Sequence, residues 1–529
     1  MCHKLYNHIH RLLFPCLAFS VITGFFSAIL ITAFKIMAGW VIRLSTAAYE
    51  AVRANPGWLP VLVIGAALVG LAASLIMSVS HSCKGGGIPT SVAAIRGIFS
   101  FRWVSGVFLL PISALLTFLA GLPLGTEGPC VQMGTAVGNG VVTRLGRETH
   151  RGWRRYIMTG GASAGFSIAT ASPISAVIFS MEELHKHFSP MLLSVASISV
   201  ITAQITARAL SAIGIGEVNF INIPEMQAIP VSLIFAPILL GLISGISAIL
   251  FTWLYHITDR IMRIVLKRCS GKILLPALFA LVAVVGFFLA DTLGSGHSFI
   301  DSLLTRGAAW YILVLLFLLR AIGMMICNTS GATGGVFLPT LAFGAIVGAL
   351  CAEGMISLGW IGAEHYVLMV VLGVTSFLGA TSRIPLTACI FAVEALGGIN
   401  NVLPIVIATT VALLSVEASG LEDLTDKIID AKLHKITKGK KPLDIVVPLT
   451  VDRDAFVVGK ELRDVLWPNS CVVVAFNRAN PSVGHGAILE GDVITVKYVT
   501  YDPSVTEREL HDLVGEQSAD IRRVMNACA

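Results

Sequence analysis

The chain has 529 residues, of which 55% are hydrophobic and 13% charged, with a mean hydropathy of +0.83 and a net charge of +6. Globular proteins carry about 25% charged residues, so this composition excludes an ordinary water-soluble protein. The small positive charge suits a membrane protein with basic cytoplasmic loops and gives no reason to expect nucleic acid as a partner.

Apolar runs recur along the chain, and a spanning helix needs about 20 mostly apolar residues. The first run follows Lys4 and Arg11, as in a signal peptide. It continues past the length of a signal sequence and meets no A-x-A cleavage site, so we expect a retained first span. The sequence therefore predicts an all-α polytopic membrane protein. The runs lie at 15–38, 58–80, 103–121, 190–207, 230–255, 272–290, 311–327, 336–350, 366–380 and 402–417.

The loop "RLGRETHRGWRR" (144–155) carries five arginines, which places it in the cytoplasm by the positive-inside rule. The apolar pieces that follow, 156–170 and 173–181, are each too short to cross a membrane comfortably. They predict a re-entrant pair that returns Glu183 and Lys186 to the cytoplasmic side.

The membrane part of the sequence contains an internal repeat. "GTEGPCVQMGTAVG" (125–138) matches "GVFLPTLAFGAIVG" (335–348) at an offset of 210 positions, and "PISAVIFSMEEL" (173–184) matches "PLTACIFAVEAL" (385–396) at 212. Two matches in the same order at nearly the same offset indicate a duplicated domain. Such repeats with interrupted helices are typical of transporters, whose ligand site lies between the repeats.

Three segments share one pattern, in which glycines precede a proline near the start of an apolar helix: "KGGGIPT" (84–90), "GTEGP" (125–129) and "GGVFLP" (334–339). In lipid, non-helical backbone persists only where it lines a cavity walled by protein. Proline suits the first helical turn, and glycine lets backbone amides approach a ligand. Several helix N-termini aimed at one point would bind an anion through free N–H groups.

Glu127 is the only charged residue between Arg102 and Arg144. A carboxylate at mid-membrane costs at least about 2.5–3.5 kcal/mol, so a stabilising environment is expected. At a helix N-terminus the ionised carboxylate can occupy the place of the anion, and the protonated form can leave it. We therefore predict that Glu127 couples a proton to anion passage; the alternative is a glutamate that only caps its helix.

These three motifs, in this order and joined to the repeat, resemble the signature stretches of the CLC family of chloride channels and proton/chloride exchangers. The resemblance covers roughly residues 12–432 and implies two inverted repeats of broken and re-entrant helices. It divides the chain into a transmembrane domain at 1–432, with repeat halves at approximately 50–210 and 230–420, and a cytoplasmic domain at 433–529. It also implies a homodimer with one pore per subunit and both termini in the cytoplasm.

By position, Glu127 resembles the external gating glutamate of the family, and Glu183 resembles the internal glutamate that transfers protons in the exchangers. The alternative for Glu183 is a carboxylate at a helix end that faces water beside Lys186. The anion-binding positions that the motifs and the resemblance imply are Gly86, Gly87, Ile88, Gly128, Val336, Phe337 and Thr425.

The chain departs from the family pattern at three positions. Gly86 stands where the family commonly has a serine whose hydroxyl contacts the anion. Thr425 is the best counterpart of a tyrosine that supplies a second hydroxyl. Thr126 precedes the gating position, where a basic residue is common. The backbone amides of the site remain.

Beyond about residue 440 the pattern changes to short alternating segments that predict a small α+β domain. The expected strands lie at 445–451, 471–478 and 492–499, and the expected helices at 459–466 and 504–515. The run that begins "VVGKELRDVL" resembles the TrkA-C domain (RCK C-lobe) of prokaryotic ion transporters. This resemblance implies regulation by a small ligand or by dimerisation, and favours a prokaryotic plasma membrane. The alternative is a stabilising module without a ligand.

The sequence thus predicts proton-coupled antiport of chloride or a similar small anion, such as nitrate or fluoride. A passive chloride channel of the same family is the main alternative. A monovalent cation transporter, suggested by the tail, is a remote one, because a T-V-G-Y-G filter is absent. We expect no enzymatic activity, since the chain has no H-E-x-x-H motif, and no cofactor or metal.

Overall fold

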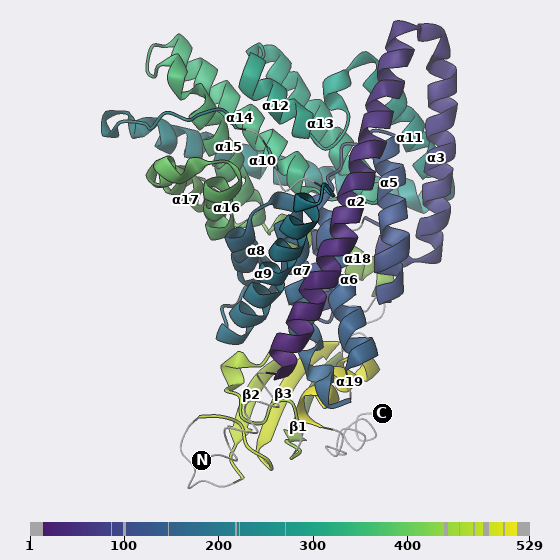
Figure 1. Cartoon of the computed structure of the whole chain (residues 1–529), viewed down its shortest axis with the longest axis vertical. Helices are drawn as coiled ribbons and strands as arrows, with labels where there is room; N and C mark the ends of the chain where they lie inside the picture. Colours follow the sequence, from purple (N-terminus) through teal and green to yellow (C-terminus); the bar gives the residue numbers. More distant parts are fainter. Residues whose placement is uncertain are drawn as a thin grey trace.

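The computed structural model describes residues 14–85, 87–98, 102–146, 148–216, 220–221, 223–269, 271–437, 443–453, 455–468, 471–479, 486–500 and 503–515. A large helical domain forms most of the molecule, and a small domain with three strands lies at one end (Figure 1). The first described helix, α2 (Phe14–Ala54), begins at that same end.

The helical domain falls into two halves. Helices of the first half are α2 (Phe14–Ala54), α3 (Leu59–Val79), α4 (Ile88–Ile95), α5 (Leu110–Leu119), α6 (Glu127–Leu145), α7 (Arg154–Thr170), α8 (Pro173–Phe179) and α9 (Pro190–Ala212). The rest are α10 (Phe235–Arg268), α11 (Gly271–Phe288), α12 (His297–Arg306), α13 (Trp310–Ser330), α14 (Phe337–Ser357), α15 (Tyr366–Ser382), α16 (Pro385–Ala395), α17 (Val402–Ala418) and α18 (Leu424–Thr437).

Nine helices in the described part of the chain are long and apolar enough to cross a membrane, and they coincide with nine of the ten predicted runs. They are α2, α3, α9, α10, α11, α13, α14, α15 and α17. The tenth run, 103–121, forms a shorter apolar helix, in which a π-helical segment at Ser105–Leu109 continues into α5.

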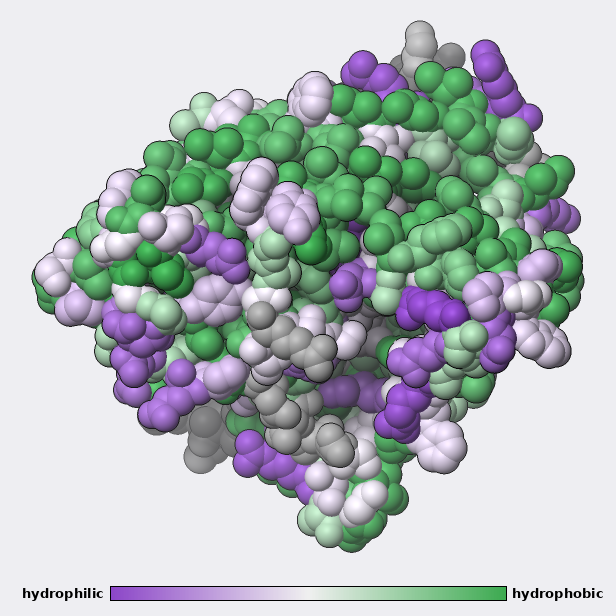
Figure 2. All heavy atoms as spheres, turned by 90° about the horizontal axis from the view of Figure 1, so that it is seen from above, coloured by the Kyte–Doolittle hydropathy of each residue, from purple (hydrophilic) through white to green (hydrophobic). Residues whose placement is uncertain are grey.

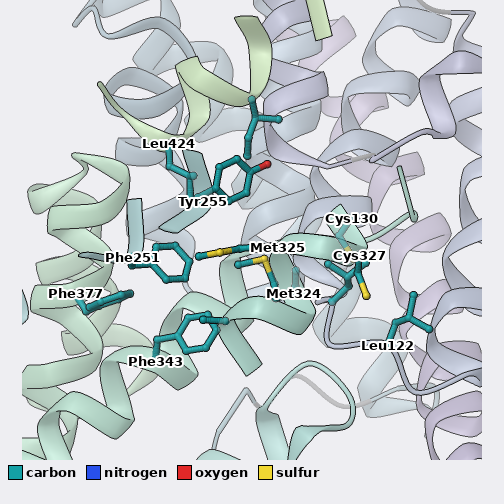
Figure 3. Close-up of a cluster of buried hydrophobic side chains, with 14 of the residues drawn as sticks. Leu122, Cys130, Phe251, Tyr255, Met324, Met325, Cys327, Phe343, Phe377 and Leu424 are labelled. Carbon is teal, nitrogen blue, oxygen red and sulfur yellow. The ribbon is translucent and has the colours of Figure 1, made fainter. Parts of the chain in front are cut away.

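Hydrophobic side chains cover a broad, continuous part of the outer surface (Figure 2). A surface of this kind needs lipid around it, because water would not solvate it. Inside, α10, α13, α14 and α15 meet in an aromatic and methionine-rich cluster (Figure 3). The ring of Phe251 lies 5.1 Å from that of Phe343 and 5.6 Å from that of Phe377, measured between centroids.

The two halves pack in the same way, as the sequence repeat predicts. α6 packs on α7, and α14 packs on α15. A Cβ on Gly134 of α6 would lie 2.0 Å from the carbonyl oxygen of Gly161, and a Cβ on Gly344 of α14 would lie 2.6 Å from that of Gly373. Glycine therefore allows the backbones of both helix pairs to touch, at equivalent positions of the repeat.

Two glutamates make reciprocal contacts between the halves. Glu182 accepts a hydrogen bond from the backbone N–H of Thr387 (2.8 Å) at the start of α16. Glu394, its counterpart 212 positions later, accepts one from the N–H of Ser175 (2.8 Å) at the start of α8. Carboxylates suit helix N-termini, where N–H groups lack partners. Because each half caps a helix of the other, a pseudo-two-fold axis relates them.

The C-terminal domain is an antiparallel sheet in the order β1-β3-β2, followed by a helix. Its elements are β1 (Leu443–Thr450), β2 (Cys471–Asn477), β3 (Val493–Thr500) and α19 (Pro503–Val514). The predicted helix at 459–466 is wrong, because only Leu462–Asp464 forms a 3-10 turn. The hydroxyl of Tyr156 donates to Asp464 O and accepts from the N–H of Leu466 (3.0 Å), so these backbone groups bond to α7 instead of continuing a helix.

Helix α18 runs past the predicted domain boundary at residue 433. Its side chains return to the helical domain, where Lys432 Nζ donates to Gly85 O (2.8 Å) and to the hydroxyl of Thr90. The polar stretch up to Thr437 therefore belongs to a helix with partners in the helical domain.

The C-terminal domain packs on the arginine-rich loop that the sequence places in the cytoplasm. The ring of Trp153 meets that of Phe456 edge-on, with centroids 5.4 Å apart. Arg155 forms an ion pair with Glu509 and donates to Leu466 O (3.2 Å). Buried side chains of both domains form one hydrophobic cluster, so this contact is part of the folded structure.

Lys460 is buried at this contact and gives it a pH dependence. Its Nζ lies 3.0 Å from the ring centroid of Phe456 and 5.3 Å from that of Trp153. Burial lowers the pKa of Lys460 well below its ordinary value. Between that pKa and about 10.4, the unfolded chain binds more protons than the folded one. We therefore expect the thermal unfolding midpoint to rise with pH in this window.

The matched variant is Lys460→Met, which keeps the length of the side chain and removes the titration. Its unfolding midpoint should rise less steeply with pH than that of the wild type, when both are followed by tryptophan fluorescence. Equal slopes for the two proteins would show that the ammonium group of Lys460 is not desolvated.

Candidate functional site

The three glycine–proline segments meet at one place. The N–H of Gly125 donates to Gly335 O (2.7 Å), and the N–H of Gly335 donates to Gly125 O (2.8 Å), as an antiparallel bridge. A Cβ on Gly128 would lie 2.6 Å from Gly335 Cα, and a Cβ on Gly87 would lie 3.2 Å from Gly128 Cα. Backbone touches backbone among all three segments, which glycine alone allows. We call Gly87, Gly125, Gly128 and Gly335 the glycine junction.

Three helices begin at the glycine junction. α4 starts with Ile88, α6 starts with Glu127, and α14 starts with Phe337 after Val336 as its N-cap. The first-turn N–H groups of a helix have no partner inside it, and each N-terminus carries about half a positive charge. The junction can therefore attract an anion without any fully charged cation.

The predicted position Gly86 lies outside the described residues. The N–H of the next predicted residue, Gly87, donates to Oε1 of Gln132 (2.7 Å), whose Nε2 donates to Ser82 O (2.8 Å). Gln132 thus fastens the start of α4 to α6. Gln132 is not among the positions predicted from sequence, although a glutamine inside an apolar run is a usable signal.

Glu127 lies directly at the junction and is 2% exposed. Its Oε1 accepts a hydrogen bond from the hydroxyl of Thr126 (2.9 Å), and its Oε2 has no hydrogen-bond partner among the described residues. A Cβ on Gly125 would lie 2.5 Å from that Oε2 and 3.2 Å from the Cβ of Leu338. The carboxylate therefore sits beside the first turn of α14 as well as at the start of its own helix.

One cation from a distant helix lies within electrostatic reach of Glu127. It is Lys35 in α2, which acts on the carboxylate of Glu127. Lys35 Nζ also donates to Ile168 O (3.0 Å) near the end of α7. The sequence shows no cation near Glu127, so only the packing of α2 against the first repeat reveals Lys35.

The side chain of Phe337 packs among other aromatic rings. It is 4% exposed, and its ring lies 5.1 Å from that of Phe166 and 5.8 Å from that of Phe391, between centroids. The anion-binding role predicted for Phe337 therefore depends on its backbone N–H.

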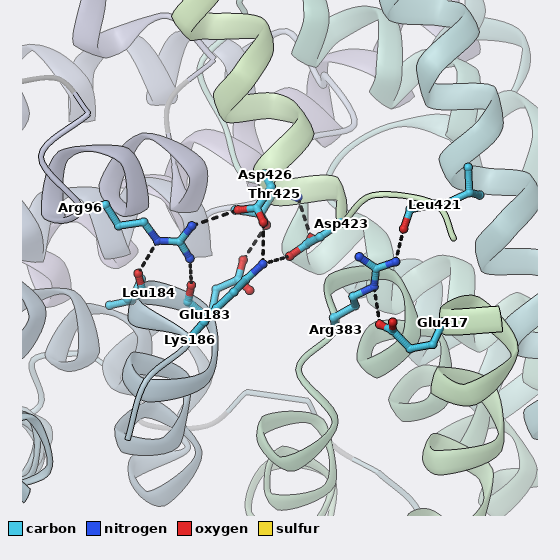
Figure 4. A network of polar contacts seen from close by, with 10 residues as sticks. All are labelled: Arg96, Glu183, Leu184, Lys186, Arg383, Glu417, Leu421, Asp423, Thr425 and Asp426. Carbon is cyan, nitrogen blue, oxygen red and sulfur yellow. Dashed lines mark hydrogen bonds and ion pairs between the residues drawn. The ribbon is translucent and has the colours of Figure 1, made fainter. Parts of the chain in front are cut away.

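Glu183 and Thr425 lie together in a second polar cluster (Figure 4). The hydroxyl of Thr425 donates to Oε1 of Glu183 (2.5 Å), and Oε2 of Glu183 has no partner in the described part of the chain. The alternative of a carboxylate that faces water is wrong, because Glu183 is only 2% exposed. The hydroxyl of Thr425 is thus engaged with this glutamate, and its predicted contact with the anion stays a prediction.

Helix α4 joins the two clusters. Its N-cap, Gly87, lies in the junction, and its C-cap, Arg96, donates to the backbone carbonyl oxygens of Glu183 (2.8 Å) and Leu184 (2.8 Å). Eight helical residues span about 12 Å, which sets the scale of the separation. Arg96 also forms an ion pair with Asp426 (3.0 Å).

Lys186 and two aspartates complete the charge arrangement around Glu183. Lys186 Nζ contacts Asp423 (3.0 Å) and Asp426 (2.6 Å). Burial raises the pKa of Asp423, while Lys186 opposes this. Burial also raises the pKa of Asp426, but its contacts with Lys186 and Arg96 outweigh this and hold it below the ordinary value. Asp423 is therefore the aspartate of the pair that accepts a proton more readily.

The fold and site define a class of protein: a membrane protein of two inverted repeats, whose broken helices meet around a buried carboxylate. A family model described as voltage gated chloride channel matches residues 65–417. The chain therefore belongs to the voltage-gated chloride channel family, as the motifs predict.

Relatives and solved structures agree with this assignment. The chain is 27% identical over 404 residues to an H(+)/Cl(-) exchange transporter ClcA of Vibrio cholerae. The matched region covers 73% of this chain and 81% of the relative. Its fold is similar to that of a slow cyanobacterial Cl-/H+ antiporter, with a TM-score of 0.71 and 22% identity; the match covers 80% of this chain and 98% of the antiporter. It is also similar to that of a CLC-type fluoride/proton antiporter, with a TM-score of 0.63 and 20% identity; this match covers 76% of this chain and 95% of the other.

Proposed function

We propose that this protein exchanges chloride, or a similar small anion, for protons across the cell membrane, with Glu127 as the external gate. Membership of the family and the exchange of chloride and protons for which its relatives are named support the substrate and the proton coupling. The observation that carries the proposal is the buried carboxylate of Glu127 at a junction of three helix N-termini.

The anion site is proposed to rest on main-chain dipoles. One helix N-terminus stabilises an anion by about 0.3–2 kcal/mol, so three could replace much of the hydration of a small anion. A site without a full positive charge holds the ion weakly enough for it to leave. The same dipoles would exclude a cation, which disfavours a monovalent cation transporter.

Glu127 is proposed to compete with the anion for this site. When ionised, its carboxylate stays at the junction beside α14 and blocks the path. When protonated, it loses its attraction to the N-termini, so the side chain can move and admit an anion. Each exchange of carboxylate and anion therefore moves one proton on or off the glutamate.

Glu183 is proposed to deliver the proton from the cytoplasmic side. It is buried, it accepts one hydrogen bond from Thr425, and it lies in a cluster that also holds Asp423 and Lys186. These charged groups connect a buried carboxylate to the surface, which is the requirement for proton transfer to an internal acid.

The experiment compares anion and proton fluxes in proteoliposomes for wild type and Glu183→Gln. We expect the variant to keep most of its anion flux and to lose proton flux at least about tenfold, because an amide cannot carry the proton. Glu182→Gln is the matched control, because Glu182 is the neighbour of Glu183 in sequence but caps α16. The proton flux of this control should persist. Proton flux that survives in Glu183→Gln would remove this residue from the pathway.

We further propose a homodimer with both termini in the cytoplasm. Adjacent helices α8, α9, α16 and α17 present large hydrophobic side chains to the outside, among them Ile174 (60% exposed), Ile205 (65%), Leu386 (52%) and Leu403 (61%). The beginning of α2 and the C-terminal domain lie at the same end of the molecule as the arginine-rich loop, which supports a cytoplasmic position for both termini (Figure 1).

A further inference from the structure

A cavity of about 300 Å³ lies between the C-terminal domain and the helical domain, and its lining is strongly basic. Arg96 and Arg155 line it from the helical domain, and Arg463 lines it from the C-terminal domain. Two histidines of the helical domain, His185 and His187, also line the cavity. None of the described residues that line the cavity is acidic.

The arginines that line the cavity keep part of their hydrogen-bonding capacity. A guanidinium group has five N–H donors, and bonds to described residues use three of them in Arg96 and two in Arg155. Arg463 pairs with Glu461 (2.8 Å), but both side chains are largely exposed, so this pair is weak and can open. The carboxylates that contact the three arginines do not line the cavity.

The remaining lining is apolar and includes one large ring. Trp467 and Leu462 contribute to it from the C-terminal domain, and Ile95 from the end of α4. The indole N–H of Trp467 already donates to Leu462 O (3.4 Å), so its ring offers mainly a flat apolar surface. Pockets for small organic ligands begin at about 300 Å³ and combine apolar walls with a few charged groups.

We propose that this cavity binds a nucleoside monophosphate or a similarly small organic anion, with its phosphate on the arginines and its ring on Trp467. Arginine pairs with phosphate through parallel N–H···O bonds, and it prefers planar anionic groups for this reason. The binding requires no transport activity and goes beyond the proposed function.

The position of the cavity gives the ligand a route to the transport site. Arg96 lines the cavity and also donates to the backbone carbonyl oxygen of Glu183 (2.8 Å). A phosphate on Arg96 would compete with its ion pair to Asp426, and so would change the support of Glu183. This regulatory step, unlike the binding, rests on the proposed function of Glu183.

Binding is tested by thermal unfolding of the full-length protein in detergent. AMP, GMP, CMP and UMP are each added at the same millimolar concentration, with inorganic phosphate and adenosine as partial ligands. At least one nucleotide should raise the unfolding midpoint by several degrees, and more than either partial ligand does. No rise with any of the four would overturn the proposal. An equal rise with phosphate alone would overturn the role of the ring.

The site is tested by variants of the C-terminal domain. Arg463→Gln should weaken nucleotide binding about tenfold or more, because it removes a charge-assisted hydrogen bond. Trp467→Leu should also weaken nucleotide binding, because it removes the flat ring and keeps only an apolar wall. The control Arg453→Gln removes an exposed arginine that does not line the cavity, and binding should be unchanged. Unchanged affinity in both cavity variants would also contradict the assignment.

The regulatory step is tested separately, by anion flux of the wild type with and without the nucleotide that binds. A change in flux that disappears in Arg463→Gln supports regulation from this cavity. Binding without any change in flux would overturn the regulatory step and leave the binding site intact. Absence of all anion flux, in contrast, would contradict the proposed function and not the site.

Discussion

Glu127→Gln is expected to abolish proton transport and to leave an anion flux that no longer depends on pH. The amide keeps the shape of the side chain but cannot bind or release a proton, and it has no charge to hold it at the helix N-termini. Anion and pH traces recorded together from proteoliposomes measure both effects. We expect proton flux to fall by at least about a hundredfold, as for the loss of an essential proton carrier.

The control for this substitution is Glu225→Gln, which removes a carboxylate from an exposed loop residue. Its two fluxes and their pH dependence should match those of the wild type. If Glu127→Gln behaved in the same way as this control, the carboxylate at the junction would be a helix cap and not a gate.

Gly128→Ala is expected to disrupt the glycine junction itself. The new Cβ would lie 2.6 Å from Gly335 Cα and 3.1 Å from Gly87 Cα, so it would collide with backbone that cannot rotate away. Overpacking of this kind costs about 1–3 kcal/mol of stability. A displacement of about 1 Å at the site can also lower the rate about a hundredfold. Thermal unfolding and anion flux measure the two effects.

Gly354→Ala is the matched control, because this glycine also lies in a helix that starts at the junction, and a Cβ there meets nothing within 4 Å. It should be as stable as the wild type or more stable, since alanine favours helix by about 1 kcal/mol over glycine. Wild-type flux and stability in Gly128→Ala would show that the three segments are not held in contact.

The membrane domain could be predicted from sequence because its signals are local. Each apolar run reports one helix, and each glycine–proline segment reports one interruption. The repeat then pairs Gly125 with Gly335, which the structure joins by two backbone hydrogen bonds. Glycine and proline restrict the backbone wherever they occur, so these features need no knowledge of tertiary contacts.

The parts that could not be predicted depend on contacts between distant segments. Lys35 reaches the site from α2, and Lys432 reaches the loop before α4 from α18. The 3-10 turn at Leu462–Asp464 replaces a predicted helix because Tyr156, some 300 positions earlier, takes its backbone hydrogen bonds. Local propensity favoured the helix, and a tertiary contact overrode it.

Thr425 shows the same limit at the functional site. Alignment to the family motif indicates which residue occupies a position but not which group its hydroxyl meets. The structure brings Thr425 to Glu183, since α18 packs against the end of α4 and the segment that carries Glu183. The contact that a replaced side chain makes therefore has to come from the structure, because the family motif fixes only its position in the sequence.

The central claim is that the movement of an anion and a proton is obligatorily linked. The most direct test is the reversal potential of the wild-type protein in a bilayer with a chloride gradient and an opposing proton gradient. Coupled exchange predicts a reversal potential that shifts when only the proton gradient is changed. A reversal potential that stays at the chloride equilibrium value at every pH would contradict the account and show a passive channel.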